Sequence, residues 1–163
     1  MQDQNQMISR LASALLSKGW RLVTVESCTG GWIAETATSV AGSSDWFECG
    51  LVTYSNDSKT RLAGVPADLI ERYGAVSGEV VCAMTKGALA RTNANVAIAV
   101  SGVAGPGGGS EEKPVGTVFI AWQFPGFEAH SQRFHFHGDR EAVRRQTVST
   151  ALEELTRILE SSS

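Results

Sequence analysis

Short apolar runs alternate with amphipathic segments along the first part of the chain. Apolar residues recur at helical spacing over 7–16, and Gly19 supplies the left-handed residue that ends a helix. A β-branched run at 22–25 predicts a strand, the polar segment 26–31 a sharp turn, and the pattern over 32–40 a second helix. This part of the chain is therefore predicted to fold as helix, strand, turn and helix.

The alternation continues through the rest of the chain. We expect strands at 46–54, 96–100, 115–124 and 128–137, and helices through 62, between Pro66 and Gly74, from 77 toward 91, and from about 139 to 159. The strand at 96–100 is almost wholly apolar, which is typical of a strand buried on both faces. Pro125 and Gly126 separate the last two strands and favour a hairpin there.

Helices that alternate with strands predict an α/β fold, a three-layer α/β/α sandwich with a mixed, mostly parallel central sheet. The 163 residues suit a single domain over 1–163, and we expect frayed ends at 1–5 and 160–163. In such folds, ligands bind outside the carboxyl ends of the strands. Three loops follow predicted strands, at 26–31, 54–59 and 101–109.

Composition narrows the possible partners and the compartment. The formal net charge is −3, so the chain lacks a general cationic field and we expect no nucleic-acid partner. Cys28, Cys49 and Cys82 are widely spaced without a CxxC pair, which favours a reducing cytosol over a disulfide framework or a zinc ribbon. The sequence has no signal-peptide pattern and no apolar run of about 18 residues, so we expect a cytoplasmic chain without a membrane span.

The first loop places hydroxyl groups where a strand ends and a helix begins. Ser27 or Thr29 would lie beside the N–H groups of the helix amino end, which can hold an anion or stabilise an oxyanion. Alternatively, either hydroxyl simply caps the helix. The loop matches neither the GxSxG nor the SxxK pattern. Cys28 is a rival nucleophile, although we favour a packing role for it.

The second loop brings a tyrosine and a lysine to the end of the next strand. Lys59 can serve as the base for a serine if burial and its neighbours bring its pKa from about 10.4 toward neutrality. Tyr54 could hydrogen-bond that amine or relay a proton. The alternative for Lys59 is a solvated surface charge, and spacing alone does not decide between the two.

The third loop is the densest glycine cluster of the chain. Glycines permit positive φ angles and close backbone approach, so successive N–H groups can form an anion-binding nest. The loop matches neither GxGxxG nor the P-loop pattern. Over 102–106 the abrupt exit from a buried strand favours a ligand contact, whereas 107–113 is compatible with a flexible surface loop.

Two arginines occupy the first turns of the closing helix, where cations are unfavourable unless an anion offsets them. A bound phosphate would do so through paired hydrogen bonds to Arg140 and Arg144. Surface pairing with Asp139 or Glu141 is the alternative. The two histidines near the end of the last strand lack a third ligand at suitable spacing, so we expect no metal site.

Four ordered blocks of the sequence resemble the CinA carboxy-terminal-domain family, the nicotinamide-nucleotide amidohydrolases or NMN deamidases. The blocks are VESCTGG at 25–31, GLVTYSN at 50–56 with Lys59, GAVS at 74–77 and SGVAGPGG at 101–108. The resemblance covers nearly the whole chain. It corresponds to the stand-alone form, without the additional amino-terminal domain that relatives often carry.

The resemblance implies an enzyme that hydrolyses the carboxamide of nicotinamide mononucleotide (NMN) to nicotinic acid mononucleotide and ammonia. It also implies pyridine-nucleotide salvage, no cofactor or metal, and commonly a homodimer. Ser27 would be the nucleophile, Lys59 the general base and Tyr54 the residue that orients or relays, with N–H groups at 29–31 stabilising the oxyanion. The residues implied to hold the mononucleotide are Thr29, Gly30, Gly31, Asn56, Ser101, Gly102, Ala104, Gly105, Arg140 and Arg144.

Two other functions stay open at this point. A non-catalytic nucleotide-binding or regulatory module would need the glycine loops and the arginines but not Lys59. A serine amidase would act on a different small amide.

Overall fold

A five-stranded sheet forms the centre of the molecule in the computed structural model, which describes residues 3–161. Its strands are β1 (Leu22–Glu26), β2 (Phe47–Val52), β3 (Val96–Gly102), β4 (Thr117–Gln123) and β5 (His130–His135). They lie in the order β2-β1-β3-β4-β5. β1 pairs in parallel with β2 and β3, whereas β4 is antiparallel to β3 and β5. Four of these five strands thus share one direction, and the mixed, mostly parallel sheet is confirmed.

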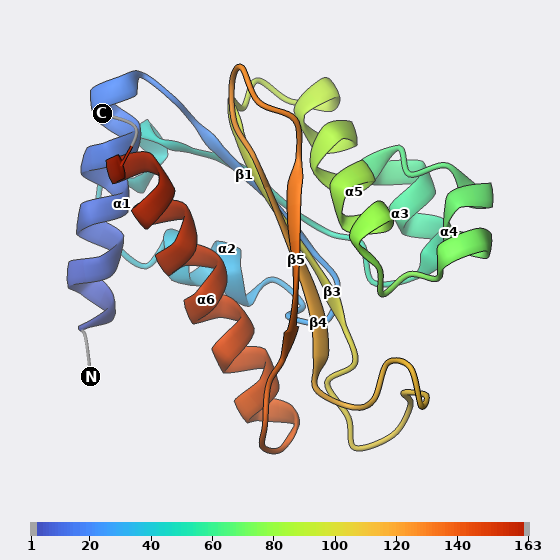
Figure 1. Ribbon diagram of the computed structural model, residues 1–163. Coiled ribbons are helices and arrows are strands. Elements are labelled where there is room, and N and C mark those ends of the chain that lie inside the picture. The colour runs from blue at the N-terminus through green and yellow to red at the C-terminus, as the bar shows by residue number, and fades with distance from the viewer. Residues whose placement is uncertain (1–2, 162–163) are drawn as a thin grey trace.

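Helices cover both faces of the sheet (Figure 1). They are α1 (Gln4–Lys18), α2 (Trp32–Ala37), α3 (Asn56–Ala63), α4 (Ala67–Tyr73), α5 (Gly78–Arg91) and α6 (Arg140–Ser161). In Figure 1, α1, α2 and α6 lie on one side of the sheet and α3, α4 and α5 on the other. The predicted three-layer α/β/α sandwich is therefore confirmed.

Side-chain alternation along β1 divides the hydrophobic core into two layers. Leu22 packs into the cluster that α1 and α6 complete, whereas Val23 and Val25 pack into the cluster under α3, α4 and α5. Every residue of β1 is buried, as expected for a strand covered on both faces. In the first layer, the indole N–H of Trp122 donates to the Ala151 carbonyl of α6 at 3.0 Å. Each face of the sheet thus has its own packed layer.

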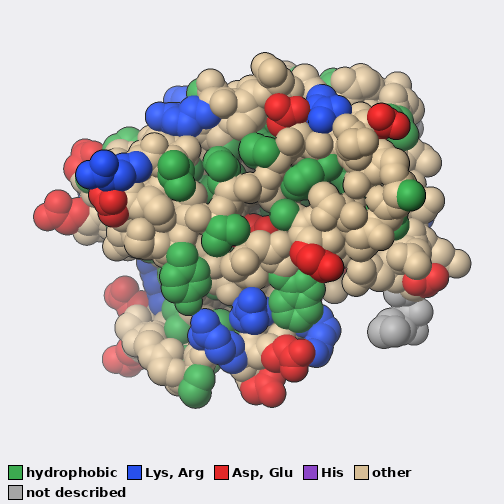
Figure 2. Space-filling model, turned by 180° about the vertical axis from the view of Figure 1, so that it is seen from behind, with side chains coloured by type: hydrophobic (Ala, Val, Ile, Leu, Met, Phe, Trp, Pro, Cys, Tyr) green, Lys and Arg blue, Asp and Glu red, His purple; other side chains and the backbone are tan. Residues whose placement is uncertain are grey.

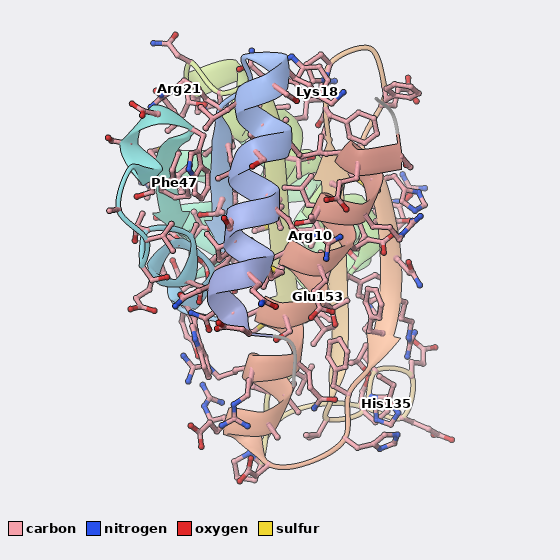
Figure 3. The ribbon with its side chains drawn as sticks, turned by 90° about the vertical axis from the view of Figure 1, so that its left-hand side faces the viewer. Arg10, Lys18, Arg21, Phe47, His135 and Glu153 are labelled. Atoms are coloured by element: carbon pink, nitrogen blue, oxygen red, sulfur yellow. The ribbon has the colours of Figure 1, made fainter. Side chains whose placement is uncertain are left out.

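Polar contacts fix the outer elements of this sandwich. Figure 3 shows Arg10 of α1 pointing toward α6, and its guanidinium pairs with the Glu160 carboxylate of that helix at 2.5 Å. Arg21, which precedes β1, donates to the Phe47 carbonyl at 3.0 Å and to the Glu48 carboxylate at 2.8 Å. These last two contacts hold the edge strand β2 against β1, and β2 leads into the second predicted loop.

A glycine allows α3 to approach α5 closely. A Cβ atom on Gly87 of α5 would lie 1.5 Å from the Ala63 carbonyl oxygen at the end of α3, so a larger residue cannot fit without displacing that helix. Because α3 carries Lys59, this contact contributes to the position of the lysine over the sheet.

Helix α2 is shorter than the pattern over 32–40 predicts. It ends at Ala37, and a short 3₁₀ turn (Ser43–Asp45) leads into β2. The hydroxyls of Thr38 and Ser39 bond back to carbonyls three and four residues earlier, which is a typical way for such side chains to accompany a helix end.

Helices begin and end close to the limits of the described residues. α1 begins at Gln4 because the Asp3 side chain caps it, accepting the Asn5 amide at 3.1 Å. Residues 4–5 and 160–161, where we expected frayed ends, are helical, whereas 1–2 and 162–163 lie outside the described residues. No helix within 3–161 is long and apolar enough to cross a membrane.

Candidate active site

A cavity of about 340 Å³ opens at the carboxyl ends of β1, β2 and β3, the place predicted from the fold class. Its size falls within the range of roughly 300–1,000 Å³ that is usual for small-molecule sites. The predicted site residues in its lining are Ser27, Tyr54, Asn56, Lys59, Ser101, Gly102, Ala104, Gly105 and Arg140. All three predicted loops and the start of α6 therefore meet at one cavity.

Ser27 directly follows β1 and is held by the sheet. Its amide donates to the Val100 carbonyl of β3 at 3.1 Å, so the parallel ladder continues one residue beyond the strand. Alternation puts Ser27 on the same face as Val25, the face that α3 and α5 cover. Only 8% of the residue is exposed. The serine hydroxyl is thus fixed at the floor of the cavity.

Lys59 of α3 reaches that hydroxyl from the helix layer. Its Nζ lies 3.0 Å from Ser27 Oγ and donates to the Thr53 carbonyl at 2.8 Å and the Tyr54 carbonyl at 3.0 Å. The lysine is 1% exposed, which rules out the alternative of a solvated surface charge. The structure therefore brings together the serine and the lysine that the sequence could only suggest as partners.

Burial lowers the pKa of Lys59 below its ordinary value, because a charged amine is poorly solvated there; the nearby Cys28 thiol acts weakly in the opposite direction. A neutral amine has two N–H groups and one lone pair. If the N–H groups point at the two carbonyls, the lone pair faces Ser27 Oγ. This geometry suits an amine that accepts the serine proton.

Tyr54 contacts Lys59 differently from the prediction. Its main-chain carbonyl accepts the lysine amine, whereas its hydroxyl lies 3.2 Å from an Arg140 guanidinium nitrogen and the residue is 60% exposed. The expectation that the Tyr54 hydroxyl bonds or relays to Lys59 is not met in this structure. The reason is that α3 turns the lysine under the backbone of 53–54 while the tyrosine ring points outward.

The amino end of α2 is already occupied by a side chain of the protein. One oxygen of the buried Glu26 carboxylate accepts the Thr29 hydroxyl at 2.5 Å and the Gly31 and Ile33 amides at 3.2 and 2.8 Å. The other oxygen accepts the Ala34 amide at 3.0 Å. The Glu26 carboxylate therefore takes the position at which we expected a ligand anion.

This cap corrects the prediction for 29–31. The Gly30 amide donates to the Ser27 carbonyl at 3.1 Å and the Gly31 amide to Glu26, so neither is available to an oxyanion. Thr29, Gly30 and Gly31 are also absent from the cavity lining. Glu26 itself was missed, because it belongs to β1 and lies well before the N-cap residue Gly31, so no local capping pattern identifies it.

Cys28 has the properties of a packing residue. It is 7% exposed and belongs to the core cluster on the α2 side, although it also touches the cavity. Burial raises the pKa of its thiol to about 12. A thiol that stays protonated is a poor nucleophile, which agrees with the preferred interpretation of this residue.

The two arginines of α6 have different surroundings. Arg140 lines the cavity and donates to the Gly105 carbonyl at 2.8 Å. Arg144 lies outside the lining; it donates to the Cys28 and Thr29 carbonyls at 3.1 Å each and lies over the Trp32 ring. The alternative was that these arginines pair with Asp139 or Glu141 on the surface. Neither does so, and Glu141 pairs instead with Arg145.

Figure 2 shows basic side chains gathered beside hydrophobic ones at the lower end of the molecule, the end where Figure 1 places the start of α6. Among the described residues, no group of three or more His, Cys, Asp or Glu side chains could hold a metal ion. The polar side-chain groups in the cavity lining are hydroxyls, the Asn56 carboxamide, the Lys59 amine and the Arg140 guanidinium.

Comparison with known proteins decides the family. Residues 4–159, almost the entire chain, match the family described as the CinA C-terminal domain. The chain belongs to the CinA C-terminal domain family. A Pseudomonas putida member named nicotinamide-nucleotide amidohydrolase PncC is 56% identical, with 93% of this chain and 94% of that one covered. The Escherichia coli K12 protein of the same name is 49% identical over 92% of this chain and 91% of its own.

Solved CinA structures share the fold closely. The crystal structure of a CinA superfamily protein from Klebsiella pneumoniae covers 98% of this chain at 40% identity with a TM-score of 0.92, and 99% of that chain is covered. A longer relative also exists, the CinA-like protein of Citrifermentans bemidjiense. It is 50% identical over 97% of this chain, which spans 38% of that protein.

Not every block shared with the CinA family had a role assigned in advance. Ala75 and Val76 of the GAVS block line the cavity, although their residue types offer no chemical reason to expect them there. Gly107, Gly108 and Gly109 also line it, although that half of the loop had been compatible with a free surface segment. Membership of an ordered block was the only sequence signal for Ala75 and Val76, because apolar residues carry no recognisable chemistry.

Proposed function

We propose that this chain is an amidohydrolase that converts NMN to nicotinic acid mononucleotide and ammonia, with Ser27 as nucleophile and Lys59 as its base. The printed names of relatives 49–56% identical over nearly the full chain support the substrate. The observation that carries the chemistry is the buried Lys59 Nζ, 3.0 Å from Ser27 Oγ. An uncharged lysine in that position is what a serine nucleophile requires.

Acylation begins with the transfer of the Ser27 proton to neutral Lys59. The serine oxygen attacks the carboxamide carbon, and the carbonyl oxygen becomes an oxyanion. The protonated Lys59 then gives its proton to the amide nitrogen, the carbon–nitrogen bond breaks and ammonia leaves. An ester between the nicotinoyl group and Ser27 is formed, and Lys59 is neutral again.

Deacylation uses the same two residues, with water as the nucleophile and Ser27 as the leaving group. Lys59 removes a proton from a water molecule, and the resulting hydroxide attacks the ester carbon. The bond to Ser27 Oγ breaks, the serine regains its proton from Lys59, and nicotinic acid mononucleotide is released. No atom other than those of substrate and water is consumed.

Arg140 is the residue we assign to the phosphate of the mononucleotide. Its guanidinium lines the cavity and contacts the exposed Tyr54 hydroxyl and the Gly105 carbonyl, so it is anchored beside the opening. The backbone of 104–109 lies next to it and completes a site suited to an anion. Arg144 is not part of this site, because its donors serve carbonyls of the 27–31 turn.

The homodimer implied by the resemblance remains part of this proposal, together with a cytoplasmic location. Large hydrophobic side chains are exposed on several helices, among them Leu16, Leu62 and Tyr73. Light scattering on the purified chain measures its mass directly; a mass of about 17.3 kDa, that of one chain, would contradict the dimer.

An ammonia-release assay over a small panel tests the proposed function. The panel contains NMN, nicotinamide riboside, free nicotinamide and an unrelated small amide. The proposal expects kcat/KM to be highest for NMN, with the riboside next. Ammonia from none of them would favour a non-catalytic nucleotide-binding module, and a preference for the unrelated amide would favour a different amidase.

A further inference from the structure

The oxyanion needs a donor that the amino end of α2 does not supply. The Gly30 and Gly31 amides are both engaged within the protein, and the Glu26 carboxylate fills the positive end of that helix. Acyl transfer without preorganised donors at the developing negative charge would lose a large part of its rate enhancement. The donor must therefore come from another part of the cavity wall.

Ser101 stands beside Ser27 in the neighbouring strand. Glu26 pairs with Val100 in the parallel β1–β3 register, so the next residues in line are Ser27 and Ser101. Neighbouring strands lie about 4.8 Å apart. Alternation from Ala99, which packs under α5, directs Ser101 to the same face as Ser27. A carbonyl group bound to Ser27 Oγ is thus within reach of the Ser101 side chain.

The Ser101 hydroxyl belongs to the cavity wall and makes no hydrogen bond within residues 3–161. The residue is 2% exposed and lines the cavity, and none of the hydrogen bonds among residues 3–161 involves its Oγ. A serine hydroxyl carries one O–H donor, and this one is therefore free to donate to a ligand in the cavity. By contrast, the buried Ser77 hydroxyl donates to the Gly74 carbonyl and caps α5.

We propose that Ser101 Oγ donates a hydrogen bond to the carboxamide oxygen and that this bond strengthens as the oxygen becomes an oxyanion. The proposal rests on the amidohydrolase function proposed above. Ser101 transfers no proton in the reaction; it keeps its hydrogen throughout.

The test is a kinetic comparison of Ser101→Ala with the wild type and with Thr24→Val. Thr24 is the matched control: its hydroxyl also lacks a hydrogen-bond partner, but it lies in β1 on the other face of the sheet, outside the cavity. Removal of one oxyanion donor lowers kcat by about 10²–10³-fold in comparable enzymes. We expect a loss of that order for Ser101→Ala, with KM for NMN within about threefold of wild type.

The two variants and the wild type distinguish a transition-state role of Ser101 from a structural one. Thr24→Val is expected to keep wild-type kcat and KM. If Ser101→Ala raises KM and leaves kcat unchanged, the hydroxyl binds the ground state only and the proposal is wrong. If the variant does not fold, as judged by its thermal unfolding, the hydroxyl is structural and the proposal is equally wrong. Failure of the amidohydrolase function would be seen separately, as wild-type protein that releases no ammonia.

Discussion

Lys59 Nζ lies 3.0 Å from Ser27 Oγ, and its two other hydrogen bonds go to the consecutive carbonyls of Thr53 and Tyr54. The carbonyls come from the loop after β2, the serine follows β1, and the lysine comes from α3. Three elements therefore have to pack correctly before the amine can face the hydroxyl. A nucleophile and base arranged in this way depend on the fold rather than on a local motif.

The pH dependence of turnover follows from the lowered pKa of Lys59. The base must be neutral in the free enzyme, so kcat/KM is expected to rise with pH and to level off above the pKa of Lys59. Because burial lowers that pKa, the plateau begins below 10.5, the ordinary value for lysine. The measurement is a pH profile of kcat/KM for NMN. A rate that keeps rising in proportion to hydroxide up to pH 10.5 would contradict it.

The same shift predicts how stability changes with pH. Between the lowered pKa in the folded state and about 10.5 in the unfolded chain, the unfolded chain binds more protons, so the free energy of unfolding rises with pH. Lys59→Met removes this contribution. The difference in unfolding free energy, wild type minus variant, is therefore expected to grow from neutral pH toward pH 10 in urea titrations. A difference independent of pH would show that the lysine titrates normally.

Glu26 is predicted to be a stability residue of the 27–31 turn. Glu26→Gln replaces one acceptor oxygen by an NH₂ group that cannot accept an amide, so at least one of four hydrogen bonds is lost in a buried place. We expect a loss of about 1–3 kcal/mol in urea unfolding. Glu35→Gln, an exposed change in the same helix, is the control and is expected to cost less than about 0.5 kcal/mol. Equal effects of the two changes would refute the role of the cap.

The two arginines of α6 are predicted to have different roles: Arg140 binds the substrate phosphate, and Arg144 supports the 27–31 turn. Arg140→Ala is expected to raise KM for NMN at least about tenfold and to change KM for nicotinamide riboside much less, since the riboside lacks the phosphate. Arg144→Ala is expected to change KM for NMN and for the riboside by the same factor, because Arg144 contacts the Cys28 and Thr29 carbonyls. The measurement is steady-state kinetics with both substrates. The assignment of Arg140 to the phosphate is wrong if Arg140→Ala raises KM for both substrates by the same factor.

The order of elements and the three loops of the site could be predicted because they follow from local patterns. Hydrophobic periodicity identified the buried strand at 96–100, and glycines and polar residues marked the loop after it. What could not be predicted depends on contacts between distant residues. The burial of Lys59 is one example, since a lysine in a polar turn has no local signal that it will point under the backbone of the preceding loop.

Glu26 is a second residue whose contacts could not be predicted from local patterns. The sequence correctly indicated a helix amino end at 31–32 with an affinity for negative charge. It did not indicate that the charge would come from the preceding strand, because that requires the chain to turn back through 27–31. The direction of the Tyr54 ring, outward toward Arg140, likewise depends on α6, which lies 86 residues further along the chain.

The most direct test of the account compares Ser27→Ala with Cys28→Ala in the NMN ammonia-release assay. These neighbours were the two candidate nucleophiles, and both are small buried residues whose replacement by alanine is expected to leave the thermal unfolding of the protein nearly unchanged. We predict that Ser27→Ala lowers kcat at least about 10⁴-fold and that the kcat of Cys28→Ala stays within about tenfold of wild type. Retained turnover in Ser27→Ala, or its loss only in Cys28→Ala, would contradict the assignment of Ser27 as the nucleophile.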